Sequence, residues 1–341
     1  MRQVLISFLI LVANINIYAQ GCCSGGAGSP IAGGAASGVL QEYQMEISAN
    51  YQLNKSNTFY TGSEVAEQLF ENLTSNYMFF RTNYGVSKKL TLSLATGYYL
   101  NKTKEAEDIT DNMTSSGFSD LIILPRYSVY NKRNNFKRTE IALGLGIKMP
   151  LGAHMDSTLT VAASSYAPGY PDKDLYALNP PSVQTTNGAN DFMLYSFIFR
   201  EYQKKKLRLF ISALHVKKNY NSLGLKFGDY SSLGLFISKT FFRQWGVTTQ
   251  LKLEHVGKIQ SAENIDPELY GINPISTGSN KAFITPQISY SKNGLTFFAT
   301  SEIPVYQYLH GTQIGSQNQF TFGINYRFLT KECDPEFELE K

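Results

Sequence analysis

The cysteines and histidines are the residues of this chain with the most versatile chemistry. Cys22 and Cys23 are adjacent in a glycine-rich stretch, GCCSGGAGSPIAGGAASG, and His154 has a methionine on either side. Thiolate, thioether and imidazole groups bind soft metals such as copper and zinc. Cys22, Cys23 and His154 therefore form a candidate metal site. The alternative is that His154 is a solvated loop residue. No two histidines have the spacing of a local ligand pair, so we expect no resident cofactor.

Nucleophilic catalysis requires a nucleophile beside a base that a third group orients. The chain contains only four histidines, and neither a GxSxG nor an HExxH pattern occurs in it. The sequence therefore predicts that the protein is not an enzyme.

A set of charged residues falls on the polar side of segments in which polar and apolar residues alternate. One interpretation is that these charges pair across neighbouring strands and fill the interior of a barrel. The other is that they line a permeation path. The candidate lumen-lining residues are Glu46, Arg81, Glu140, Lys148, Lys252, Glu254 and Arg327.

These side chains require strands to position them, and alternation with a period of two is the dominant pattern after residue 38. In residues 39–53 the odd positions are almost all apolar and the even positions almost all polar. Successive side chains of a strand point to opposite faces, so one face is apolar and the other is polar. About twelve such segments are predicted. They lie near residues 39–53, 75–86, 89–101, 118–131, 138–149, 188–202, 207–217, 229–242, 246–257, 281–292, 295–306 and 317–328. The alternation is less clean near 118–131 and 188–202.

The lengths of the connections also alternate. Short connections such as VSKK, QKKK and SKNG follow the even-numbered segments, and long ones follow most odd-numbered segments. The expected long connections are 54–74, 102–117, 150–187, 258–280 and 307–316. Short periplasmic turns and long extracellular loops are typical of outer-membrane barrels. The sequence predicts an all-β fold, a transmembrane antiparallel up-and-down β-barrel of about 12 strands, and a soluble sandwich would not explain this asymmetry.

The two ends of the chain have different compositions. Residues 1–19 have a basic start and a short apolar run, which is typical of a secretory signal peptide. A short buried helix and a lipoprotein signal with Cys22 as the lipidated residue are the alternatives. Residues 20–38 form a glycine-rich periplasmic or lumenal leader, either disordered or a plug, because little side-chain bulk lets them thread a narrow space. Residues 39–328 would form the barrel, and residues 329–341 an acidic periplasmic tail.

The composition fits a membrane barrel. Phe, Trp and Tyr make up 13% of the residues, with 22 Tyr and 22 Phe, which suits aromatic belts at the membrane surfaces. The mean hydropathy of −0.21 is too low for a helical membrane protein. The formal net charge of +4 is small, and no stripe of Lys and Arg occurs, so we expect no nucleic-acid partner.

This topology puts all three cysteines on the periplasmic side, in an oxidising compartment. A disulfide from Cys22 or Cys23 to Cys333 would tether the leader to the tail. The remaining cysteine would be free for a metal, a partner or a lipid.

The C-terminal part carries a family resemblance. Its loop Pro304, Val305, Tyr306, Gln307, Gly311, Gln313 and its last segment with Gly323, Tyr326 and Phe328 resemble the outer-membrane barrel family labelled meta-pathway phenol-degradation or transporter-like proteins. The segments YGVSKKLTLSLATGYY, GFSDLIILPRY and GLGIKMPLG resemble its first half. The sequence departs from that family at MPLG, where Pro-Thr-Gly is expected, and by continuing past Phe328. The resemblance implies passage of small apolar or aromatic compounds and brings no catalytic residues.

We therefore expect an outer-membrane channel or transporter of a Gram-negative-type bacterium for small molecules, including hydrophobic or aromatic ones. Its partners would be outer-membrane lipid and a small-molecule solute, and the sequence predicts no particular oligomeric state. A non-transporting structural or binding barrel and a metal-related outer-membrane channel are the alternatives.

Overall fold

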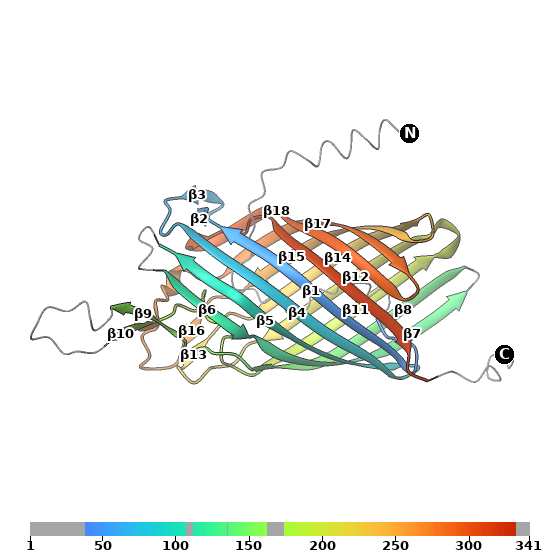
Figure 1. The fold of residues 1–341 in the computed structure, drawn as a ribbon, viewed down its shortest axis with the longest axis horizontal. Coiled ribbons are helices and arrows are strands. Elements are labelled where there is room, and N and C mark those ends of the chain that lie inside the picture. Colours follow the sequence, from blue (N-terminus) through green and yellow to red (C-terminus); the bar gives the residue numbers. More distant parts are fainter. Residues whose placement is uncertain (1–37, 107–111, 135, 162–173, 332–341) are drawn as a thin grey trace, which may run out of the picture.

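The structure, a computed structural model, describes residues 38–106, 112–134, 136–161 and 174–331. The chain forms a closed antiparallel β-barrel of 12 strands, as the sequence predicted. β19 pairs with β1 and closes the ring, with Gln44 opposite Leu329 and Leu53 opposite Phe320 (Figure 1). The wall consists of β1 (Gln44–Ser56), β4 (Asn72–Ser87), β5 (Leu90–Glu105), β7 (Asp120–Asn134), β8 (Lys137–Pro150), β11 (Asp191–Tyr202), β12 (Leu207–Lys217), β14 (Tyr230–Phe241), β15 (Trp245–Val256), β17 (Ser279–Lys292), β18 (Leu295–Ile314) and β19 (Gln319–Leu329).

The period of two arises because each strand separates two environments. In β1 the polar side chains of Glu46, Ser48 and Asn50 are buried inside the barrel, whereas Ile47 is 44% exposed on the outside. Large apolar side chains cover the outer surface in the same way, with Leu145 71% and Phe192 60% exposed. A closed ring satisfies every strand edge, which a bilayer interior requires. Within the described ranges, no helix is long and apolar enough to cross a membrane.

The two ends of the barrel differ as predicted. Tight connections join β4 to β5, β7 to β8, β14 to β15 and β17 to β18 at one end, and the short 3-10 helix η3 (Gln203–Lys205) joins β11 to β12 there. Tyr43 and Thr330, which flank the first and last strands, are hydrogen-bonded at this end. Following the rule for outer-membrane barrels, we call it the periplasmic end.

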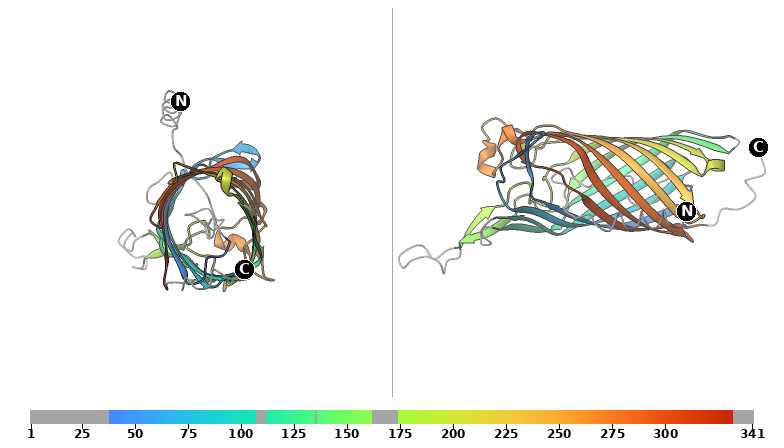
Figure 2. Two further views of the ribbon diagram at one scale, coloured as in Figure 1. Left: turned by 90° about the vertical axis from the view of Figure 1, so that its right-hand side faces the viewer. Right: turned by 90° about the horizontal axis from the view of Figure 1, so that it is seen from above.

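The long connections at the outer end contain additional short elements. These are β3 (Glu64–Ala66), β6 (Met113–Phe118), the hairpin of β9 (Ser157–Val161) and β10 (Leu175–Leu178), the pair of β13 (Leu225–Lys226) and β16 (Gln260–Ser261), and the 3-10 helices η4 (Pro267–Tyr270) and η5 (Pro274–Ser276). Viewed along the barrel, part of this chain crosses the interior of the ring instead of projecting away from it (Figure 2).

Two sequence-based boundaries were wrong. The long loop predicted over 307–316 is mostly strand, because β18 continues to Ile314 and its outer part pairs with β2 (Phe59–Gly62), placing Gln313 opposite Tyr60. At the other boundary, the segment predicted from residue 39 begins as a strand only at Gln44. Val39 and Leu40 are instead buried inside the ring. Residues 1–37 and 332–341, which include the predicted signal peptide, nearly all of the leader and most of the tail, lie outside the described residues.

Candidate functional site

The charged residues that the sequence singled out lie on the inner face of the barrel, most of them in ion pairs. Glu46 on β1 accepts hydrogen bonds from Arg327 on β19, with Nε at 3.0 Å, and from Asn83 on β4 at 2.8 Å. Because Glu46 is only 1% exposed, these donors replace the water that a buried carboxylate requires. The pair also bridges β1 and β19 at the strand seam that closes the ring.

The second group of these charges lies on β15 and β18. Lys252 on β15 is 2.8 Å from Glu302 on β18 and 3.5 Å from Glu254. Glu254 also accepts a hydrogen bond from the hydroxyl of Tyr230. The remaining predicted residue of β4, Arg81, is half-buried.

Glu140 on β8 connects the wall to the chain inside the barrel. It is fully buried and binds Arg138 at 2.7 Å. Its other oxygen accepts a hydrogen bond from the backbone amide of Val39 at 2.8 Å, and the amide of Leu40 donates to Thr91 Oγ1 at 2.8 Å. Residues 38–43, which we call the N-terminal segment, therefore run from the periplasmic rim into the lumen.

One glycine of the wall and one glycine of the segment itself allow this close fit. A Cβ at Gly85 would lie 1.8 Å from the carbonyl oxygen of Gln41, and a Cβ at Gly38 would lie 2.7 Å from the ring of Phe197. Neither separation is sterically allowed, so a residue without a side chain is required on each side of this contact. The segment is thus fitted to the wall by close backbone approach as well as by hydrogen bonds.

An inward-facing group of aromatic rings was missed by sequence reasoning. It consists of Tyr195, Phe197 and Phe199 on β11, Phe210 on β12 and Phe236 on β14, and we call it the aromatic wall. The rings of Phe199 and Phe210 are stacked with centroids 5.5 Å apart. The signal was the weak alternation near 188–202: β11 is apolar on both faces, outward toward lipid and inward toward these rings. Polar side chains are therefore only one part of the inner surface.

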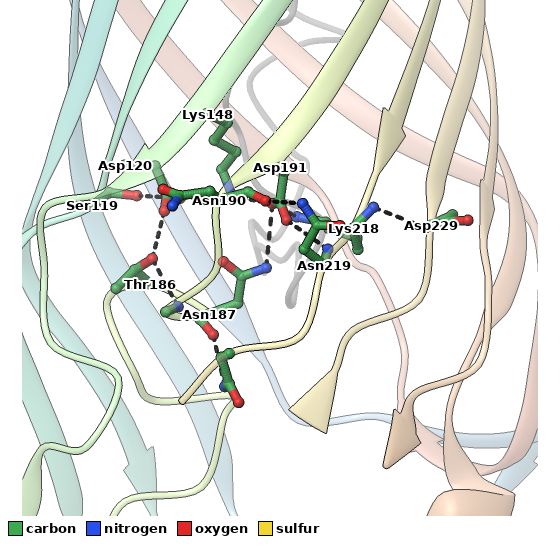
Figure 3. Close-up of polar contacts among 12 residues, drawn as sticks. Ser119, Asp120, Lys148, Thr186, Asn187, Asn190, Asp191, Lys218, Asn219 and Asp229 are labelled. Carbon is green, nitrogen blue, oxygen red and sulfur yellow. Dashed lines mark hydrogen bonds and ion pairs between the residues drawn. The ribbon is translucent and has the colours of Figure 1, made fainter. Parts of the chain in front are cut away.

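Four charged groups meet at the outer mouth of the barrel, shown in Figure 3. Lys148 on β8 is 2.8 Å from Asp120 on β7 and 3.6 Å from Asp191, at the start of β11. Lys218, which follows β12, is 2.8 Å from Asp191. We call Asp120, Lys148, Asp191 and Lys218 the mouth cluster; all four come from neighbouring parts of the wall, and three are more than 90% buried.

The mouth cluster is also the anchor of the loop that precedes β11. Thr186 Oγ1 donates a hydrogen bond to Asp120, and Lys102 on β5 donates one to the carbonyl of Gln184 at 2.7 Å. Val183 is fully buried, and Gln184 is 4% exposed. This loop therefore folds into the mouth and covers it.

Lys218 lies outside the wall strands, and its pKa is lowered. Burial, followed by the neighbouring positive charge of Lys148, lowers the pKa of Lys218 to about 8, although Asp191 opposes this shift. A lysine in this position titrates close to neutral pH, in contrast to a solvated lysine.

The periplasmic end of the lumen contains an open cavity of about 360 Å³. One side is formed by Phe197, Phe210 and Phe236 of the aromatic wall, and the rest by polar and basic residues of β12 to β19. The lumen is thus accessible from the periplasm and covered at the outer mouth.

The candidate metal ligands are not brought together by the described residues. Cys22, Cys23 and Cys333 lie outside them, so the predicted metal site and disulfide remain predictions. His154 lies in the β8–β11 loop and is hydrogen-bonded through Nε2 to Ser222 Oγ at 2.7 Å. In the part of the chain that the structure describes, no three His, Cys, Asp or Glu residues are grouped as metal ligands.

No protein-family model matches the sequence, and no curated protein matches it. Among solved structures, the chain is similar to an outer-membrane channel from Pseudomonas putida F1, with a TM-score of 0.59 and 11% identity over 85% of this chain and 97% of that chain. The KdgM porin, with a TM-score of 0.40 and 8% identity, covers 83% of this chain and 99% of its own. The NanC porin has a TM-score of 0.42 and 10% identity, over 83% of this chain and 98% of its own. The first likeness shows the fold of an outer-membrane channel, and the other two scores are too low to add to it.

Proposed function

We propose that the barrel is a gated outer-membrane channel for small solutes of hydrophobic or aromatic character. The observation that carries the proposal is the aromatic wall, a column of stacked rings on the inner surface beside an open periplasmic cavity. A water-filled path with one apolar side favours solutes that have an apolar face. The fold and the apolar outer surface are those of proteins of the bacterial outer membrane.

We also propose that the chain is a distant member of the transporter-like phenol-degradation barrel family that its C-terminal residues resemble. The proposed activity is passage and not catalysis. The N-terminal segment and the covered mouth act as the gates, since each occupies part of the path.

Two neutral solutes that do not cross bilayers by themselves test the proposal: phenyl glucoside and methyl glucoside. Vesicles containing the refolded full chain should swell faster in phenyl glucoside, although it is the larger solute, because its ring can contact the aromatic wall. A planar bilayer should show discrete conductance steps with the same preparation. A Phe210→Ser variant should lose the preference while the conductance steps persist, because Phe210 is a ring that lines the cavity.

The alternative is a structural barrel that transports nothing, and the covered outer mouth is the observation that favours it. Vesicles that fail to swell in either solute, together with the absence of conductance steps, would establish that alternative. Swelling rates that depend only on solute size, with methyl glucoside entering faster, would support a channel but reject the preference for aromatic solutes.

A further inference from the structure

The periplasmic cavity combines an apolar side with positive charge. Arg208, Arg243 and Arg327 are its charged lining residues, and neither Asp nor Glu belongs to the lining. The other lining groups are serine, threonine, glycine, asparagine and glutamine residues and the rings of the aromatic wall. Such a surface attracts an anion and not a cation.

The rings are arranged so that another ring can be added to them. Phe197 and Phe210 have centroids 6.0 Å apart and lie nearly parallel, at 23°. Phe210 and Phe236 have centroids 5.9 Å apart and meet edge to face, at 75°. These are favoured geometries between aromatic rings, and their exposed portions border the cavity.

The three arginines differ in how far their charge is already neutralised. Arg327 is paired with Glu46, and Arg208 binds Glu201 through its Nε at 3.0 Å, with its side chain 37% exposed. Among the residues that the structure describes, Arg243 forms no ion pair. The cavity therefore has a net positive charge at Arg243, and guanidinium groups bind carboxylates with two parallel hydrogen bonds.

The turn that holds Arg243 supports a role beyond chain reversal. Phe242 and Arg243 have φ values of 45° and 63°, in the left-handed region that side chains other than those of Gly, Asn and Asp rarely adopt. The equivalent turn between β17 and β18 uses Asn293 and Gly294 for the same conformation, which is the favourable choice. The β14–β15 turn instead keeps an arginine at the cavity, at a cost in backbone strain.

We propose that the periplasmic cavity is a binding site for a monocyclic aromatic carboxylate, of which benzoate is the simplest. The ring lies against Phe210 and Phe236, and the carboxylate is bound by Arg243 with help from Arg208. A volume of about 360 Å³ accommodates one such molecule with water. An uncharged aromatic compound would leave the guanidinium groups unpaired, and a small inorganic anion would leave the rings uncovered. The inference rests on the proposed channel function, for which it names a class of solute.

Calorimetric titration of the refolded full chain in detergent at pH 7 tests this site without requiring transport. The probes are benzoate, benzyl alcohol with the ring but no charge, and acetate with the charge but no ring. We expect benzoate to bind at least about ten-fold more tightly than either, because only benzoate uses both halves of the cavity. Arg243→Gln should weaken benzoate binding about ten-fold.

The matched control is Arg133→Gln, which removes a basic residue from the same end of the barrel, at the end of β7, outside the cavity lining. This variant should bind benzoate as the unaltered chain does. Circular dichroism of both variants shows whether the barrel is intact. Equal affinity for benzoate and acetate, no binding of benzoate, or equal losses in the two variants would overturn the proposal.

The same preparation separates this inference from the channel function. Benzoate binding without conductance or vesicle swelling would leave the site in place and reject the channel. Conductance and swelling with no benzoate binding would leave the channel in place and reject the site.

Discussion

At the scale of single residues, the lowered pKa of Lys218 predicts that opening of the channel depends on pH. Its pKa is about 8 in the covered mouth, against an ordinary value of 10.5. At a pH between these two values, Lys218 therefore takes up a proton when the mouth is uncovered. Covering is therefore favoured as pH rises from about 8 toward 10.5, by at most about ten-fold in the equilibrium constant per pH unit. The open probability in planar bilayers should fall between pH 8 and pH 10.

The Lys218→Met variant should have the low open probability at pH 7 as well, because it is neutral throughout. Lys217→Met is the matched control: it removes the adjacent lysine, whose side chain is 55% exposed, and should keep the pH dependence. The other charged groups around Lys218 are Asp120, Asp191 and Lys148. An open probability that rises with pH in the unaltered chain would contradict this assignment.

At the scale of elements, the N-terminal segment should behave as a removable obstruction. Gly85→Ala places a methyl group where the Gln41 carbonyl lies, so the segment must leave the wall. Single-channel conductance should rise. The free energy of unfolding should fall by more than the roughly 1–3 kcal/mol of two hydrogen bonds, because the burial of Val39 and Leu40 is lost as well.

Gly144→Ala is the control, since it adds the same methyl group to the inner face of β8, where the nearest atom is 3.0 Å away. Its conductance should match that of the unaltered chain. A conductance increase in both variants would mean that the wall, and not the segment, sets the pore size.

The strands were predictable because lipid on one side and the lumen on the other impose the same two-residue period along every wall strand. Most predicted segment ends agree with the observed ends to within a few residues. The mouth cluster was not predictable, since Lys148 meets Asp191 through the register of β8 against β11, and the long connection between these strands leaves that register open in the sequence. The aromatic wall was hidden for a related reason: when both faces of β11 are apolar, alternation no longer reports which side faces inward.

At the scale of the whole molecule, the apolar outer surface predicts that a charge placed on the wall lowers stability in lipid more than a charge placed in a loop. Leu145, near the middle of β8, is 71% exposed, and Leu269 in η4 is 79% exposed. Leu145→Arg should reduce the free energy of unfolding by about 2–4 kcal/mol, because its charge would enter the apolar layer of the membrane. Leu269→Arg should change it by less than about 0.5 kcal/mol, as expected for a solvated loop.

Urea unfolding in lipid vesicles measures both values, with the fluorescence of Trp245, the single tryptophan, as the signal. Equal effects of the two substitutions would mean that β8 does not face lipid.

The N-terminal segment also depends on the closure of the barrel. Its contacts with Glu140 and Thr91 are made inside a ring that is complete only when the last strand, β19, meets β1. The wall strands of the closed ring fit tightly around the segment, since a Cβ at Gly38 would lie only 2.7 Å from the ring of Phe197. The closing of the seam between β19 and β1 completes the surroundings of the segment, and the segment can still leave through the periplasmic rim from which it enters the lumen.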